Sequence, residues 1–295
     1  WKAKSCCASS VWPSAYGKPN FLLEAHCSMI DDPSSNTTTV HRVVGIDVGG
    51  TFTDIAVLEN GELTVHKLPS TPSDPSKGIL RGVQEIGVTS AEFVHGSTVA
   101  TNALLEGKGS RTALVTTMGF EDVLEIGRQT RPEIYDLNVS RPAPLVPAER
   151  RLGVTERIGP DGSVLLPLTR EAIEEVMATL GSLDADSVAV CLLHSYANEE
   201  HEAAILEALK GHFQGFCTAS YEILPEFREF ERCSTTAVNA YVGPVMAGYL
   251  GRLSDQLATE EVRIMQSNGG TISLDTAIEH AVQTVLSGPA GGVVG

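Results

Sequence analysis

From residue 42 onward, short apolar runs alternate with amphipathic segments along the chain. In the first part of this region the apolar residues have strand-like spacing in three successive segments, and the turn signal Glu59-Asn60-Gly61 separates the last two. The pattern therefore predicts a meander of three strands over Arg42–Asp47, Phe52–Leu58 and Glu62–Leu68.

Helix-like and strand-like patterns then alternate through the rest of the chain. Helical spacing predicts helices over Pro75–Ile86, Thr98–Leu105, Gly119–Ile126, Glu171–Leu180, Glu199–Leu209 and Cys233–Leu257. Strands are predicted over Phe93–His95, Arg111–Thr116, Ser187–Leu193 and Val262–Gln266, and a hairpin has Asp161-Gly162 at its turn. Thr169 is a good N-cap for the helix that follows it. This order of elements indicates an α/β protein.

The beginning of the chain does not share these patterns. Residues 1–28 hold both tryptophans and three of the six cysteines, without any apolar periodicity. We expect a non-native leader, with Met29 as the native start; a native but disordered extension is the alternative, and residues 1–40 are set aside in both cases. A domain boundary predicted near Ser220–Pro225 divides the remainder into 41–220 and 221–295.

Composition excludes several classes of function. The formal charge of −16 disfavours binding to nucleic acid, because acidic surfaces repel phosphate backbones. No apolar run reaches the length of about 18 residues that a membrane helix needs. The cysteines show neither a disulfide framework nor a C-x-x-C pair, which favours a reducing compartment such as the cytoplasm.

The most informative motif is the glycine-rich turn after the first predicted strand. Asp47-Val-Gly-Gly-Thr-Phe-Thr-Asp54 places an acid at the strand end, two glycines in the turn and hydroxyl groups after them. Gly49 and Gly50 allow backbone N–H groups to approach a phosphate, and Thr51 and Thr53 add donors. Asp47 beside phosphates requires a cation, most simply Mg²⁺. A plain hairpin is the alternative for a Gly-Gly turn.

Two further glycine-rich turns come late in the chain. The first is Ser267-Asn268-Gly269-Gly270, which follows a predicted strand, and the second is Ser287-Gly-Pro-Ala-Gly-Gly292. The first is also compatible with an ordinary strand-to-helix turn. The second is either the opening of an anion-binding helix or a tight packing turn.

Other polar residues have simpler interpretations. His201-Glu202 lacks a second histidine at position 205, so we expect a solvated helix face rather than a zinc site. His194 is more typical of a structural histidine, and the run Glu226–Arg232 is expected to form ion pairs along a helix. Arg128 and Arg131 lie in a polar loop, where they are candidates to bind the carboxylate of an anionic substrate.

Six ordered motifs resemble one family. They are Asp47–Asp54, His95-Gly-Ser-Thr-Val-Ala-Thr-Asn-Ala-Leu-Leu105, Gly119–Pro132, Leu193-His-Ser-Tyr-Ala-Asn198, Met265-Gln-Ser-Asn-Gly-Gly270 and Ser287–Gly292. Together they look like the hydantoinase A/5-oxoprolinase family over essentially all of residues 42–295.

The resemblance implies a fold and an activity. The fold would be an actin-like, ribonuclease-H-like ATPase lobe with a mixed sheet and flanking helices. The activity would be ATP-dependent ring opening of a cyclic amide such as 5-oxoproline or a hydantoin, with ATP and Mg²⁺ as cofactors. Asp47 is then the catalytic and metal-binding residue. The expected nucleotide-binding residues are Gly49, Gly50, Thr51, Thr53, Asn268, Gly269 and Gly270.

The resemblance also implies partners and leaves alternatives open. A homo-oligomer, or a hetero-oligomer with a hydantoinase B-type chain, is expected. Ketone carboxylase subunits are related, and a nucleotide-binding fragment without turnover is a second hypothesis. The family's second Asp-x-Gly-Gly-Thr loop does not occur before Gly295, so we expect a truncated second lobe and an inactive fragment.

Overall fold

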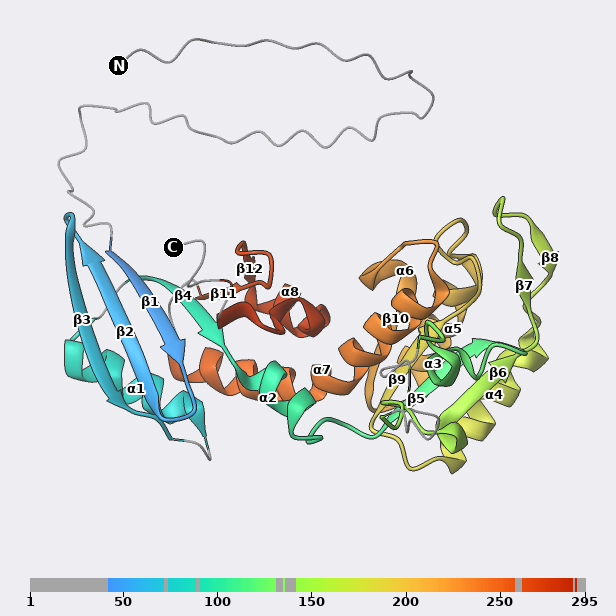
Figure 1. Cartoon of the computed structure of the whole chain (residues 1–295), viewed down its shortest axis with the longest axis horizontal. Helices are drawn as coiled ribbons and strands as arrows, with labels where there is room; N and C mark the ends of the chain where they lie inside the picture. Colours follow the sequence, from blue (N-terminus) through green and yellow to red (C-terminus); the bar gives the residue numbers. More distant parts are fainter. Residues whose placement is uncertain are drawn as a thin grey trace, which may run out of the picture. The chain divides into compact units, whose positions relative to one another are not determined.

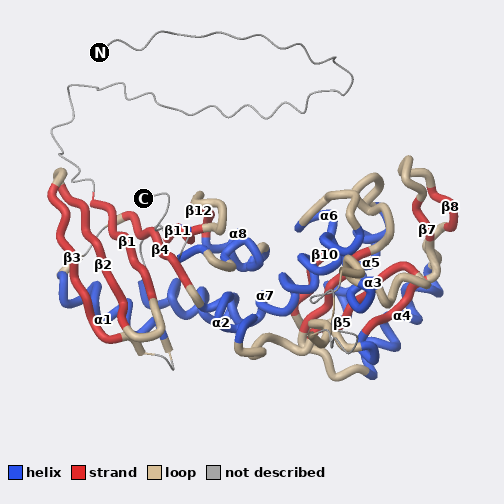
Figure 2. The backbone as a smooth tube through the Cα atoms, in the orientation of Figure 1, coloured by secondary structure: helices blue, strands red, loops and turns tan. Residues whose placement is uncertain are grey.

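The computed structural model describes residues 42–71, 74–88, 91–130, 135, 142–257, 262–288 and 290. The predicted leader, residues 1–40, lies outside these residues. The described chain is an α/β structure with a mixed sheet and flanking helices, so the predicted fold class is confirmed (Figure 1, Figure 2).

Six of the described strands form the first sheet, in the order β12-β11-β4-β1-β2-β3. The meander β1-β2-β3 is antiparallel, whereas β4 runs parallel to β1 and β11 runs parallel to β4. The strands are β1 (Arg42–Val48), β2 (Phe52–Glu59), β3 (Glu62–Pro69), β4 (Glu92–Ser97), β11 (Val262–Met265) and β12 (Thr271–Ser273). The three predicted meander strands are thus confirmed.

Three helices pack against one face of this sheet: α1 (Pro75–Ile86), α2 (Val99–Leu105) and α7 (Glu229–Leu257). The α1 helix has the bounds that the sequence predicts, with Pro75 at its first position and a left-handed glycine, Gly87, after its last residue. A Cβ added to Gly82 would lie 2.3 Å from Ile55 Cδ1. Glycine therefore allows α1 to pack closely on β2.

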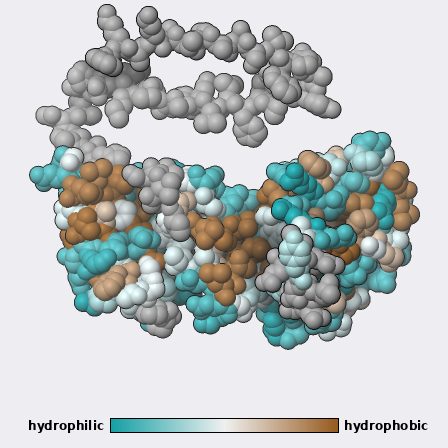
Figure 3. All heavy atoms as spheres, viewed as in Figure 1, coloured by the Kyte–Doolittle hydropathy of each residue, from teal (hydrophilic) through white to brown (hydrophobic). Residues whose placement is uncertain are grey.

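The opposite face of the meander carries apolar side chains that remain exposed. Leu58 is paired with Leu63 across β2 and β3, and their exposed fractions are 46% and 66%. Val65, on the same face, is 63% exposed. Hydrophobic residues accordingly gather over these strands in Figure 3.

Four other described strands form a second, all-parallel sheet in the order β10-β9-β5-β6. Every residue of β5 and β9 is buried, so both strands are covered on both faces. Thr169 Oγ1 accepts a hydrogen bond from Ala172 N, which confirms the predicted cap of α4. The elements are β5 (Thr112–Thr117), β6 (Arg151–Val154), β9 (Ser187–Cys191), β10 (Phe216–Ala219), α4 (Arg170–Ser182) and α5 (Glu200–His212).

The α7 helix contributes to the cores of both sheets. Tyr249 and Leu250 belong to the core of the first sheet, whereas Cys233 and Ala237 pack with residues of the second. None of the described helices is both long and apolar enough to cross a membrane. The domain division at residue 220 stays a prediction; β11 and β12, which follow it, join the first sheet.

The remaining elements are short, and one of them differs from its prediction. Gly119–Ile126 is helical only over α3 (Val123–Ile126), because the chain turns at Gly119, whose φ is +87°. The hairpin predicted around Asp161-Gly162 is present. The others are β7 (Arg157–Ile158), β8 (Val164–Leu166), α6 (Ser220–Ile223), α8 (Leu274–Glu279), η1 (Ala148–Arg150) and η2 (Ala281–Thr284).

Candidate nucleotide site at the edge of the first sheet

Three parallel strands of the first sheet, β1, β4 and β11, end at one edge. Each of them ends beside a motif that the sequence singled out: Gly49-Gly50 follows β1, Ser97-Thr98 closes β4, and Gln266–Gly270 follows β11. Because the carboxyl ends of parallel strands share an edge, pairing of β1, β4 and β11 brings distant motifs together.

Asp47 lies at this edge, on the face of β1 that is turned away from α1. It faces Asp54 across the β1-β2 pair, and Lys67 Nζ lies 2.6 Å from Asp54 Oδ1. Partial removal of water and the negative charge of Asp54 raise the pKa of the Asp47 carboxyl, and Lys67 opposes this rise. A carboxylate whose ionised form is disfavoured is suited to bind a cation.

Two glycines keep the space beside Asp47 open. A Cβ added to Gly96 would lie 3.7 Å from Asp47 Oδ1, and one added to Gly288 would lie 3.8 Å from the same atom. Both glycines line a pocket of about 310 Å³ together with Asp47, Asp54 and Met265. Asp47 thus lies where the first, second and last motifs of the sequence converge.

The Ser287-Gly288 turn is fixed to β4 and α2. Ser287 Oγ donates to Ser97 O at 3.1 Å, and Leu286 N donates to Thr101 Oγ1 at 2.9 Å. Ser287 and Gly288 have helical backbone conformation. The rest of this motif, Pro289 and Gly291-Gly292, lies outside the described residues.

The Gly49–Thr53 turn is held from behind by Ser70, a residue that the sequence analysis did not single out. Ser70 Oγ donates to Gly49 O at 2.8 Å, and Thr53 Oγ1 contacts Ser70 Oγ at 3.0 Å. Thr53 is fully buried, whereas Gly50 and Thr51 are exposed. The geometry places Thr53 behind the turn and leaves Gly50 and Thr51 accessible to a ligand.

The second predicted loop forms its own tight turn between β11 and β12. Asn268 Oδ1 accepts a hydrogen bond from Gly270 N at 2.8 Å, and Gly269 has a φ of +86°. Gln266 N donates to Gly270 O at 2.8 Å. Among the described lining residues of the Asp47 pocket, β11 contributes Met265 but nothing from Asn268–Gly270.

The structure does not bring Arg128 to Asp47. Arg128 lies after α3, and its Nη2 is 2.6 Å from Glu231 Oε1 in the first turn of α7. Tyr249, the α7 residue that reaches β4, lies about 27 Å further along the helix, at 1.5 Å per residue. The other predicted substrate-binding arginine, Arg131, lies outside the described residues.

His95 connects β4 to β1 and α7 in the core below the site. Its Nε2 lies 2.6 Å from Tyr249 Oη, and its Nδ1 lies 3.3 Å from Ile46 O, the carbonyl that precedes Asp47. Burial lowers the pKa of His95 to about 4, and the bond to Ile46 opposes this shift. His95 is therefore neutral in the folded protein at neutral pH.

This burial predicts sensitivity to mild acid. Unfolding returns the pKa of His95 to about 6.5. Between pH 6.5 and about 4 the unfolded chain therefore binds a proton at His95 that the folded chain does not bind, and the free energy of unfolding decreases as the pH falls through this window. We expect a loss of about 3 kcal/mol over this window. Urea unfolding at several pH values measures it: His95→Gln should flatten the dependence and His66→Gln should not. Equal slopes for wild type and His95→Gln would contradict the assignment.

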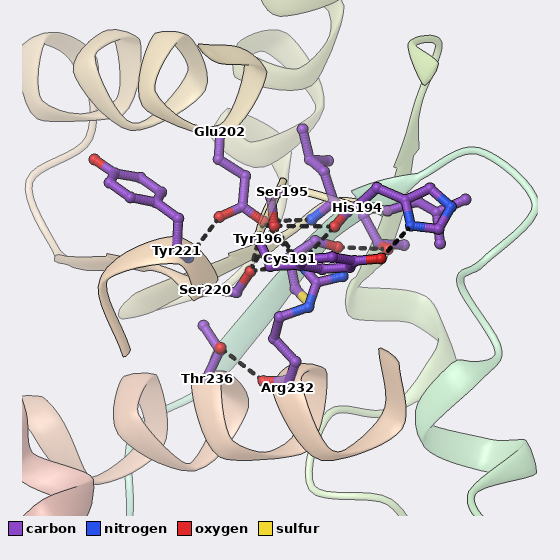
Figure 4. Close-up of polar contacts among 12 residues, drawn as sticks. Cys191, His194, Ser195, Tyr196, Glu202, Ser220, Tyr221, Arg232 and Thr236 are labelled. Carbon is purple, nitrogen blue, oxygen red and sulfur yellow. Dashed lines mark hydrogen bonds and ion pairs between the residues drawn. The ribbon is translucent and has the colours of Figure 1, made fainter. Parts of the chain in front are cut away.

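A second polar cluster is buried between the second sheet and the helices α5, α6 and α7 (Figure 4). Arg232 from α7 and Glu202 from α5 are 1% and 0% exposed, and they converge on Ser195 and Ser220. Arg232 Nη1 donates to Leu192 O at 2.8 Å and to Ser220 Oγ at 2.9 Å. Glu202 Oε1 accepts from Leu192 N at 2.6 Å and from Ser220 Oγ at 2.7 Å.

Two sequence interpretations are therefore wrong. His201-Glu202 is not a solvated helix face, because His201 is only 5% exposed and bonds Glu156 at 2.7 Å. Arg232 does not pair along the surface of its helix; it extends into the second sheet's core. Charged residues in an amphipathic pattern give no signal of burial when their partners come from other elements.

Comparisons with known proteins agree with this fold. The model of the hydantoinase/oxoprolinase N-terminal region matches residues 43–213, and that of hydantoinase/oxoprolinase matches residues 232–295. Caprolactamase subunit alpha of Pseudomonas jessenii is 35% identical over 84% of this chain, and 5-oxoprolinase 1 of Arabidopsis thaliana is 35% identical over 85%. The chain spans 38% and 23% of these two proteins.

Solved structures are similar as well. The nucleotide-free structure of acetone carboxylase, from work on ATP-dependent acetone carboxylation, superimposes with a TM-score of 0.75. It is 28% identical, and the match covers 86% of this chain and 40% of that one. The crystal structure of ATP-dependent caprolactamase from Pseudomonas jessenii gives a TM-score of 0.73 at 33% identity, over 84% of this chain and 39% of that one.

Proposed function

Because the chain belongs to the hydantoinase/oxoprolinase family, we propose that it supplies part of the ATP site of an enzyme that opens a cyclic amide. The observation that carries this proposal is the convergence of Asp47, Gly96 and Gly288 at the end of β1, the strand that the Gly49-Gly50 turn follows. The match to 5-oxoprolinase and caprolactamase sequences supports the substrate class.

The residues at this edge fit a magnesium–nucleotide complex. Among the described residues, no three His, Cys, Asp or Glu side chains are grouped closely enough to hold a metal by themselves. Mg²⁺ does not need such a group, because it is commonly bound by one or two carboxylates together with phosphates and water. Asp47 would hold the ion, and the exposed Gly50 and Thr51 would contact phosphate oxygens.

The chemistry required for ring opening explains why such a site is useful. ATP would supply a phosphoryl group to the amide oxygen, which turns a poorly reactive carbonyl into one that water can attack. Asp47 would fix the position of the metal, while Gly50 and Thr51 would orient the phosphates. Ser70 and Thr53 would keep the turn in place from behind.

A partner subunit belongs to the same proposal. The Pseudomonas jessenii relative is itself a subunit, so this chain would act with a second subunit, of the hydantoinase B type. The second candidate function is ATP-dependent carboxylation of a ketone, and the similarity to acetone carboxylase is the observation that supports it.

Calorimetric titration of the chain with ATP and ADP tests the nucleotide site. We expect ATP and ADP to bind only in the presence of Mg²⁺. AMP should not compete with them, because the proposed contacts are to the outer phosphates, which AMP lacks. Binding that is equally strong with EDTA, or that AMP displaces, would contradict the assignment of Asp47 and the Gly49-Gly50 turn.

A further inference from the structure

A second pocket is lined by the Gly49-Gly50 turn, which does not line the Asp47 pocket. Its volume is about 520 Å³, within the range typical of small-molecule sites. Its walls come from the turn, from Ser70, Thr71 and Pro75, and from helices α2 and α7. We refer to it as the α2–α7 pocket. Of the site residues expected from the sequence, only Gly49 and Gly50 line this pocket.

The lining of this pocket is apolar at the base and polar near the turn. Val48, Ala103 and Tyr249 are buried side chains that contribute apolar surface. Thr98 and Asn102 contribute polar groups from the start of α2. A small ring with one polar edge is complementary to such a surface.

The charged residues of the pocket have partners of opposite sign. Lys108 Nζ lies 2.6 Å from Glu106 Oε2, and Arg252 Nε lies 3.8 Å from Asp74 Oδ1. Because these cations are already paired, the pocket favours a neutral ligand over a free anion.

Asn102 has unused hydrogen-bonding capacity. Its Nδ2 donates one long bond of 3.4 Å to Thr98 Oγ1, and within the described part of the chain its Oδ1 accepts none. Thr98 Oγ1 is held by Val48 O at 3.1 Å. A carboxamide offers a donor and an acceptor side by side. It therefore complements an amide that presents N–H and C=O on the same side.

A ring forces that geometry on its amide, whereas an open-chain secondary amide is trans. We propose that the α2–α7 pocket binds the cyclic amide substrate, with Asn102 pairing to the ring amide and the Gly49-Gly50 turn next to its oxygen. This inference rests on the proposed function for the substrate class. In this proposal the neutral side chain of Asn102 recognises the substrate, a role that the sequence analysis gave to Arg128 and Arg131.

The test measures lactam binding to the chain without nucleotide. Ligand-detected NMR titrations would use 2-pyrrolidinone and ε-caprolactam, with N-methylacetamide as the trans amide. We expect saturable lactam binding that Asn102→Ala weakens by about tenfold, because two neutral hydrogen bonds are lost. The isosteric Asn102→Asp should also weaken it, because a carboxylate still accepts from the lactam N–H but cannot donate to the lactam C=O. Asn60→Gly, a control at a left-handed position of the β2-β3 turn, should bind as wild type does.

Three results would overturn the inference: no lactam binding by wild type, equal affinity for N-methylacetamide, or unchanged lactam affinity in both Asn102 variants. Magnesium-dependent nucleotide binding, measured on the same samples, separates this outcome from failure of the proposed function. If Asp47→Asn loses nucleotide binding while the Asn102 variants bind lactam normally, only the inference fails. If Asp47→Asn binds nucleotide normally while the Asn102 effect holds, only the nucleotide assignment fails.

Discussion

Asp47→Asn should weaken magnesium-dependent nucleotide binding on the order of 100-fold, the equivalent of a charge-assisted contact worth about 3 kcal/mol. Asparagine keeps the shape of the side chain but removes the charge that would hold Mg²⁺. Calorimetry with Mg·ADP measures the change. Asp54→Asn is the matched control, because Asp54 is paired with Lys67, and it should have a smaller effect.

The same variant should not lose stability. Because the folded-state pKa of Asp47 is raised, the ionised carboxylate opposes folding at neutral pH, and this cost disappears as pH falls below 3.8. Asp47→Asn should therefore be at least as stable as wild type at pH 7, with the difference shrinking in acid. A clear loss of stability at pH 7 would make Asp47 a structural residue, and unchanged nucleotide affinity would remove it from the site.

Arg232→Met should destabilise the protein by about 3–5 kcal/mol, because it leaves the Glu202 carboxylate buried without its cation. Burial already raises the pKa of Glu202, and hydrogen bonds from Ser220 and Leu192 together with Arg232 oppose that rise. Without Arg232 the carboxyl should favour its protonated form more strongly. The deficit should then decrease as pH falls toward 4.5, because a raised folded-state pKa stabilises at low pH.

Chemical unfolding of a double-mutant cycle checks this prediction. Glu202→Gln removes the negative charge, so the double variant should be more stable than the sum of the two single effects predicts, by at least about 1 kcal/mol. Arg170→Met is a control at an exposed arginine that pairs with Glu174 on α4, and it should cost less than about 1 kcal/mol. Additive effects at 202 and 232 would show that the two charges do not act as a pair.

Sequence alone determined the elements that local spacing of apolar and polar residues specifies. Strand-like spacing located β1, β2 and β3, and helical spacing located α1 over Pro75–Ile86. The strand predicted over Ser187–Leu193 is β9, all of whose residues are buried. The sequence also located the glycine-rich turns and the family. These features depend on spacing along the chain, which the sequence contains in full.

Only the tertiary structure decided which of these elements meet. The pairing of β11 with β4 and the bonds of Ser287 and Leu286 put Gly288 beside Asp47, although the chain between them spans most of the fold. Thr51 and Thr53 are equivalent in the sequence pattern, yet Thr53 lies in β2 with its side chain buried, whereas Thr51 lies in the turn before β2 and is exposed. The sequence pattern of Glu202 and Arg232 is that of surface charges, but the packing of α5 and α7 against β9 buries both side chains. Side-chain burial and long-range contact depend on packing between distant segments, and local spacing carries no record of that packing.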